Sequence, residues 1–100
     1  MTRSLRDTHS EHLRDPAVAA EYLNAALEDG DPSVLLMALR NIAEAQEGGI
    51  AGVAERAHLG RESMYKMLSA SGNPKLSSFT RLIHSLGLRL EVHAESAREG

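Results

Sequence analysis

Apolar residues recur at helical spacing in two consecutive stretches, each of which follows an Asp-Pro pair. Asp15-Pro16 precedes the first stretch and Asp31-Pro32 precedes the second. Apolar side chains at positions i, i+3, i+4 and i+7 line one face of a helix. The aspartate before each proline can cap the first turn, and proline suits the first helical position. Glycine ends both stretches, so we expect helices from Pro16 to Gly30 and from Pro32 to Gly48.

Three shorter stretches follow with the same period. The first covers residues 50–57, the second covers residues 61–69, and the third runs from about Ser77, a candidate cap, to Leu86. The period then changes from 3.6 to 2, which predicts a short amphipathic strand over residues 88–94. The alternating apolar residues are Leu88, Leu90, Val92 and Ala94.

A single strand has no partner within a chain that is otherwise helical. Its backbone N–H and C=O groups are unpaired on both sides. The sequence therefore predicts a homodimer in which Leu88, Leu90 and Val92 contact the same strand of a second copy. Two alternatives remain: the strand pairs with an edge of another protein, or the segment is merely extended and packs on the helices.

The length and composition predict one all-α domain. The chain has 100 residues, and three of them are aromatic, so alanine and leucine supply most of the packing. Residues 1–14 are polar and are expected to form a flexible arm. Residues 15–94 form the domain, and residues 95–100 form a frayed tail.

Charge is distributed unevenly along the chain. The net charge is −3, but residues 1–49 carry four arginines against nine carboxylates, a net −5. Residues 50–90 carry six basic residues against two glutamates, a net +4. A basic block beside an acidic one is expected where one surface meets phosphate groups. A chance excess on solvated faces is the alternative interpretation.

Residues 50–68 match a helix-turn-helix. Ala54 supplies the small residue where the two helices cross, and Gly60 lies in the turn. The second helix carries a polar outward stripe that can read base edges in the major groove, while the following loop can hold phosphates. The residues expected to contact DNA are Arg61, Glu62, Ser63, Tyr65, Lys66, Ser69, Asn73, Lys75 and Ser77.

Other chemistries find little support. The chain has no cysteine, its five histidines lack metal-ligand spacing, and no nucleophile turn or glycine-rich phosphate loop occurs. No apolar run reaches the roughly 18 residues of a membrane span. We therefore expect a cytoplasmic protein that is not an enzyme and binds no metal or cofactor.

Two stretches resemble the addiction-module antidote family, the HigA-like antitoxins with an Xre-type helix-turn-helix. They are residues 22–32 with 39–45, and residues 59–69 with Gly72-Asn73-Pro74 and 86–90. The resemblance covers residues 15–93 and implies a five-helix, lambda-repressor-like DNA-binding domain. It also implies an antitoxin that neutralises a RelE-superfamily mRNA-cleaving toxin and represses its operon by binding double-stranded operator DNA as a dimer. Toxin contacts are expected on the arm and the first helix.

Two positions depart from the family pattern. His58 stands where the turn often has glycine, and Gly60 stands where the second helix usually has a serine or threonine cap. Two other functions are compatible with the sequence. One is a stand-alone or phage-type repressor without a toxin, and the other is a helical adaptor that no longer binds DNA.

Overall fold

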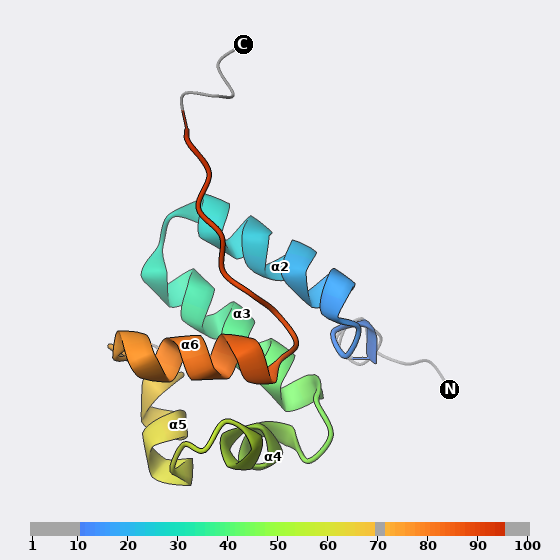
Figure 1. Cartoon of the computed structure of the whole chain (residues 1–100), viewed down its shortest axis with the longest axis vertical. Helices are drawn as coiled ribbons and strands as arrows, with labels where there is room; N and C mark the ends of the chain where they lie inside the picture. The colour runs from blue at the N-terminus through green and yellow to red at the C-terminus, as the bar shows by residue number, and fades with distance from the viewer. Residues whose placement is uncertain (1–10, 70–71, 96–100) are drawn as a thin grey trace.

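Five helices lie within residues 11–69 and 72–95, the residues that the computed structural model describes (Figure 1). All five predicted helices are present, with ends displaced by at most three residues. They are α2 (Pro16–Asp29), α3 (Pro32–Ala45), α4 (Gly49–Arg56), α5 (Arg61–Met67) and α6 (Leu76–Ser85).

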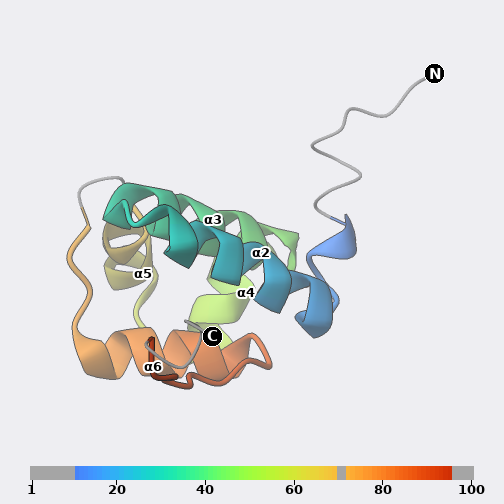
Figure 2. The same cartoon turned by 90° about the horizontal axis from the view of Figure 1, so that it is seen from above.

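Both Asp-Pro pairs begin helices as the sequence predicts. Asp15 Oδ1 accepts the backbone N–H of Ala17, and Asp31 Oδ1 accepts that of Ser33, each at 2.9 Å. Gly30 then closes α2 with φ +84°, a left-handed conformation that glycine adopts without steric cost. The short turn sets α2 and α3 side by side (Figure 2).

The end of α3 lies earlier than predicted. The helix stops at Ala45, and Gly48, with φ +79°, is the N-cap of α4 rather than the residue that stops α3. Gln46 explains the early stop because its side chain turns back to the helix. Its Nε2 donates to the carbonyl oxygen of Ile42 at 2.9 Å and to that of Leu13 at 3.1 Å.

Residues 11–14 belong to the folded domain, contrary to the prediction of an arm over residues 1–14. Leu13 is only 2% exposed, and Arg14 Nε donates to the carbonyl oxygen of Ala45 at 2.6 Å. Two contacts hold residues 11–14 in place. The Leu13 side chain joins the core, and Arg14 supplies a hydrogen bond to a carbonyl group at the end of α3 that has no partner within the helix. The remainder of the predicted arm, residues 1–10, lies outside the described residues.

The core is built from the apolar faces that the helical spacing predicts. Leu39 and Ile42 of α3 are fully buried, as are Val53 of α4, Met64 of α5 and Leu82 of α6. No polar or charged residue is buried among the described residues. Burial of these aliphatic side chains stabilises the arrangement of α4, α5 and α6 around the end of α3.

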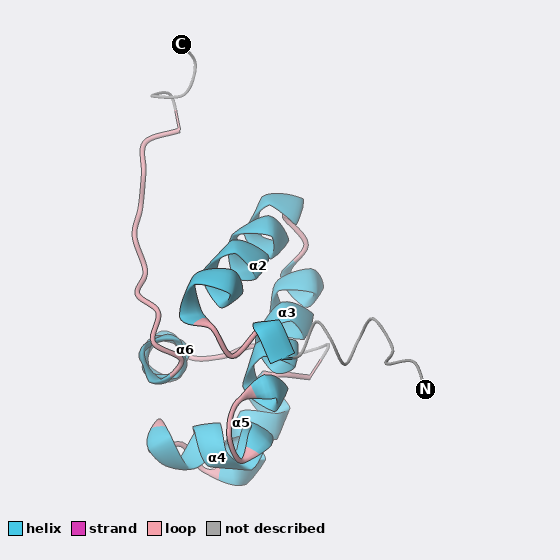
Figure 3. Ribbon diagram, turned by 90° about the vertical axis from the view of Figure 1, so that its right-hand side faces the viewer, coloured by secondary structure: helices cyan, strands magenta, loops and turns pink. Residues whose placement is uncertain are grey.

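Residues 88–94 are not a strand in the described chain (Figure 3). They leave α6 after Gly87, with the Leu88 N–H donating to the Ile83 carbonyl oxygen at 3.1 Å. A strand is defined by ladder hydrogen bonds to a neighbour, and one copy of this chain offers none here. The predicted C-terminal strand is therefore absent from the single chain, which has an exposed, extended segment in its place.

None of the described helices combines the length and the apolar character that crossing a membrane requires.

Candidate nucleic-acid interface

The helices α4 and α5 pack against each other in an arrangement that is like the predicted helix-turn-helix. Ala54, the small residue expected at the crossing of the two helices, is 2% exposed. Its carbonyl oxygen accepts the N–H of Leu59 at 2.8 Å, which closes the turn between the helices. Met64 and Met67 are the buried residues of α5, so the opposite side of this helix faces outward.

The turn between α4 and α5 contains a left-handed residue that is not glycine. His58 has φ +58°, the left-handed conformation that glycine adopts most easily. Histidine is among the residue types that tolerate this region better than most. His58 thus adopts the backbone conformation for which glycine is the most common residue.

Gly60 is the second position that departs from the family pattern. Gly60 is the N-cap of α5, with an extended backbone and no side-chain hydrogen bond to the first turn. The prediction that Gly60 caps this helix without supplying an oxygen is confirmed. The Met64 N–H donates to the Gly60 carbonyl oxygen at 2.9 Å, so regular helix begins directly after it.

Four of the five residues of the predicted outward stripe are exposed, and the stripe consists of Arg61, Glu62, Tyr65, Lys66 and Ser69. Tyr65 is 52% exposed, whereas Ser69 lies after the end of α5 and is half-buried. In the described part of the chain, Arg61, Glu62 and Lys66 form no salt bridge. Their charged groups are therefore available to an external ligand. Ser63, which the sequence also predicts to face DNA, is exposed as well.

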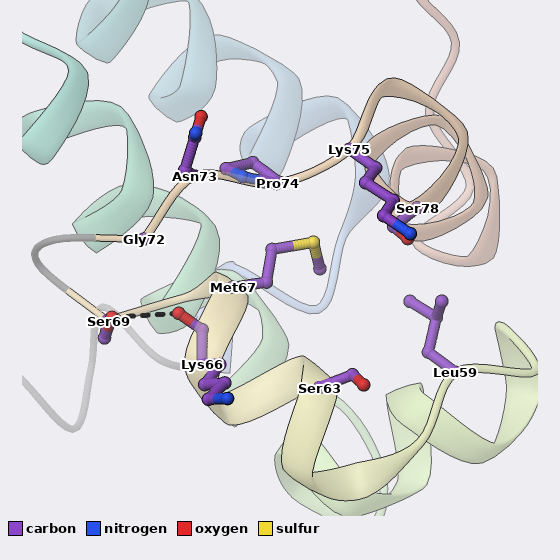
Figure 4. Close-up of a pocket in the computed structure, with 10 residues that line it drawn as sticks. All are labelled: Leu59, Ser63, Lys66, Met67, Ser69, Gly72, Asn73, Pro74, Lys75 and Ser78. Carbon is purple, nitrogen blue, oxygen red and sulfur yellow. Dashed lines mark hydrogen bonds between the residues drawn. The ribbon is translucent and has the colours of Figure 1, made fainter.

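A hollow of about 490 Å³ separates α5 from the loop that leads into α6 (Figure 4). Ser63 and Lys66 lie on the α5 side, and Lys75 and Ser78 lie on the opposite side. Five of the nine predicted DNA-contacting residues line this hollow: Ser63, Lys66, Ser69, Asn73 and Lys75. Two ammonium groups thus flank one depression, an arrangement that suits a phosphate.

Five residues that line the hollow are not among the nine predicted DNA contacts. They are Leu59, Met67, Gly72, Pro74 and Ser78. A Cβ atom at position 72 would collide with the Met67 carbonyl oxygen, so glycine allows the loop to press against the end of α5. The Gly72-Asn73-Pro74 sequence predicts a turn here. It does not predict that this turn packs against the end of α5.

Ser77 lies elsewhere than predicted. Lys75 is the N-cap of α6, with φ −69° and ψ 149°, and the helix begins at Leu76. An N-cap needs an extended backbone, whereas Ser77 already belongs to the first helical turn. Ser77 is exposed but does not line the hollow, and Lys75 makes no side-chain cap.

Comparison with known proteins identifies a family and a similar protein of unknown role. A family model described as a probable addiction module antidote protein matches residues 5–94. The chain is similar to an uncharacterized protein of Haemophilus influenzae, with 33% identity over 93 residues. That alignment covers 92% of this chain and 94% of the relative. No solved structure matches the chain.

Proposed function

Because the chain belongs to the family of probable addiction module antidote proteins, we propose that it is the antitoxin of a type II toxin–antitoxin module. In this role it binds and neutralises a RelE-superfamily toxin that cleaves mRNA. It also binds double-stranded operator DNA and represses its own operon. The unpaired cationic face of α5, on the second helix of a helix-turn-helix pair, carries the DNA-binding part of this proposal.

In the DNA complex, α5 lies in the major groove with its exposed stripe toward the bases. Arg61 donates two hydrogen bonds to a guanine, and Glu62 accepts one from a cytosine amino group. Lys66 and Lys75, on the two sides of the hollow, bind one stretch of phosphate backbone. The net charge of +4 over residues 50–90 favours this orientation, because the rest of the chain is acidic.

The toxin binds the acidic part of the chain in this proposal. Residues 1–49 carry a net −5, and an RNase that grips mRNA is expected to present a basic surface. On α2, Glu21, Glu28 and Asp29 are exposed. We place the toxin contacts on α2 and the residues that precede it. This surface is separate from the DNA-binding face of α5.

The test of the antitoxin role is co-expression of the tagged chain with the open reading frame adjacent to its gene. We expect the neighbour alone to arrest growth, the pair to grow, and the two proteins to co-purify. Replacing Glu21 and Asp29 by lysine should abolish rescue and co-purification. Lysine in place of Glu55 and Glu62, on α4 and α5, is the matched control and should preserve both.

The DNA-binding role is tested separately by an electrophoretic shift on the sequence upstream of the gene. We expect a specific shift that the double variant Arg61→Ala/Lys66→Ala abolishes without affecting rescue. A specific shift with no toxic neighbour and no complex would overturn the antitoxin role and leave a stand-alone repressor. Rescue without any shift at low salt would overturn the DNA-binding role.

A further inference from the structure

The segment that follows α6 already has the side-chain alternation of a strand. Arg89 Nη2 lies 2.8 Å from Glu91 Oε2, and His93 Nε2 lies 3.1 Å from Glu91 Oε1. These contacts between residues two apart place the three polar side chains on one side of an extended backbone. The apolar residues alternate with them: Leu90 is 46% exposed and Val92 is 97% exposed.

The backbone of this segment is open to a partner. Beyond the bond from Leu88, no backbone hydrogen bond joins residues 89–95 to any other described residue. Figures 1 and 3 show the segment running out past α2 with no neighbouring strand. Such a row of free N–H and C=O groups beside exposed apolar side chains is a template for strand pairing.

A groove of about 990 Å³ lies between α2 and this segment. Leu23 and Leu27 line its α2 side, and Leu88 and Leu90 line its other side. Leu27 is 51% exposed, so a large apolar side chain is uncovered in the groove that Leu90 also lines. The exposed edge of the backbone and the exposed apolar surface are therefore adjacent.

We infer that residues 87–93 of two copies of this chain pair as antiparallel strands about a twofold axis at Leu90, and that this ribbon lies over the two α2 grooves. The interface is isologous, because each copy contributes the same segment. Isolated two-stranded ribbons are marginal in water, but a ribbon that also packs on helices can be stable. The groove on α2 supplies that packing surface in each copy.

The charges select this register. With Leu90 opposite Leu90, Arg89 of each copy faces Glu91 of the other, and Leu88 faces Val92. A shift of two residues puts Arg89 opposite Arg89 or Glu91 opposite Glu91, and parallel in-register pairing also sets like charges together. A shift of one residue places apolar side chains opposite polar ones. Antiparallel pairing centred on Val92 also pairs opposite charges, but it sets Leu90 against Ala94 and buries less apolar surface.

The experiment measures the mass of the purified full chain by sedimentation equilibrium over micromolar concentrations, without DNA or toxin. We expect a dimer whose dissociation constant rises roughly tenfold or more in Leu90→Lys, because the substitution places two charges at the centre of an apolar contact. Leu76→Lys is the matched control, since Leu76 is 77% exposed on α6 and lies outside the groove. It should leave the dissociation constant unchanged.

The register has its own test. Arg89→Glu should weaken the dimer about tenfold, because it creates two like-charge pairs. The exchange Arg89→Glu/Glu91→Arg should restore the wild-type dissociation constant, since both pairs re-form with reversed sign. Centring on Val92 would instead set position 89 against Glu95, so the exchanged variant would remain weak, and that result would overturn the register. Circular dichroism of each variant confirms that the helices are intact.

The outcomes also separate this inference from the proposed function. A chain that is monomeric at all these concentrations would overturn the second copy as the occupant of the groove. If Leu90→Lys then also prevented co-purification with the neighbouring protein, the groove would be assigned to that protein. A dimer that responds to Leu90→Lys while the chain neither rescues growth nor binds DNA would support the inference and overturn the proposed function.

Discussion

Arg40 on α3 donates from Nη2 to the carbonyl oxygen of Leu68, the residue that caps α5, at 3.1 Å. The last carbonyls of a helix have no partner within the helix, and a cation there also opposes the negative end of the helix dipole. A helix of seven residues is not stable by itself, so α5 depends on contacts of this kind. Arg40 therefore supports α5 from a distance of 28 residues in sequence.

Arg40→Ala should lower stability on the order of 1 kcal/mol, because the freed carbonyl can turn to water. In a domain of this size the melting temperature should fall by about 4–8 °C. Operator affinity should fall in parallel, with the base preference unchanged. Thermal denaturation and binding titrations check both effects. Glu44→Ala, exposed on the same helix, is the control, and an equal loss in that variant would contradict a specific role for Arg40.

Arg61→Ala should weaken operator binding by roughly 1–3 kcal/mol and relax the preference at one base pair. The proposed cause is the loss of a bidentate hydrogen bond to guanine. Binding titrations on the operator and on operators with single base changes measure both effects. An equal loss on every sequence would assign Arg61 to a phosphate instead.

Lys66→Ala should weaken binding to all DNA sequences about equally. It should also reduce the slope of log affinity against log salt concentration by about one, because one phosphate contact is lost. Titrations at several salt concentrations provide the measurement, with Lys66→Arg as the variant that keeps the charge. A change in base preference with an unchanged salt slope would show that Lys66 reads bases.

His58→Gly should leave stability unchanged or raise it by up to about 1 kcal/mol. Glycine removes the steric cost of the left-handed backbone, and this gain is partly offset by the larger freedom of the unfolded chain. His58→Val should destabilise the domain because a β-branched side chain tolerates this conformation poorly. Urea denaturation followed by circular dichroism compares the three proteins. A marked loss in the glycine variant would indicate that the histidine side chain itself stabilises the turn.

Acid should weaken the start of α3 through Asp31. The backbone N–H of Ser33, and then its hydroxyl group, hold the pKa of the Asp31 carboxyl below its ordinary value of 3.8. A carboxyl with a lowered folded-state pKa contributes stability that is present above the ordinary pKa and is lost as pH falls through the lowered one. In Asp31→Asn the amide oxygen still caps but does not titrate. Its melting temperature should fall less between pH 7 and pH 2 than that of the wild type, and equal falls would contradict the prediction.

Local chemistry explains why most helix limits could be predicted. Asp15 and Asp31 cap helices through hydrogen bonds to residues two positions later, and Gly30 ends α2 through its own backbone conformation. Information of this kind lies within a few residues. The buried face of each helix can be predicted equally well, because it depends only on the spacing of apolar residues.

The features that escaped prediction depend on contacts between distant residues. Leu13 follows a polar stretch that predicts an arm, but its hydrogen-bond partner Gln46 lies 33 residues away in the sequence. In the sequence, Arg40 is one exposed charge on a predicted helix. Its hydrogen bond to the Leu68 carbonyl oxygen follows only from the fold. The same limit applies to the candidate site: the sequence identified Lys66 and Lys75, while the hollow that sets them opposite each other required the fold.

The burial of Leu13 determines where the smallest autonomous folding unit can start. A fragment trimmed to begin at Pro16 would keep every helix from α2 to α6 but would lose a side chain that is 2% exposed. It would also lose the Arg14 hydrogen bond to Ala45 and the Asp15 cap. Loss of a buried leucine alone costs about 2–5 kcal/mol, a large share of the stability of a small domain. Recombinant fragments of this domain should therefore start upstream of residue 13.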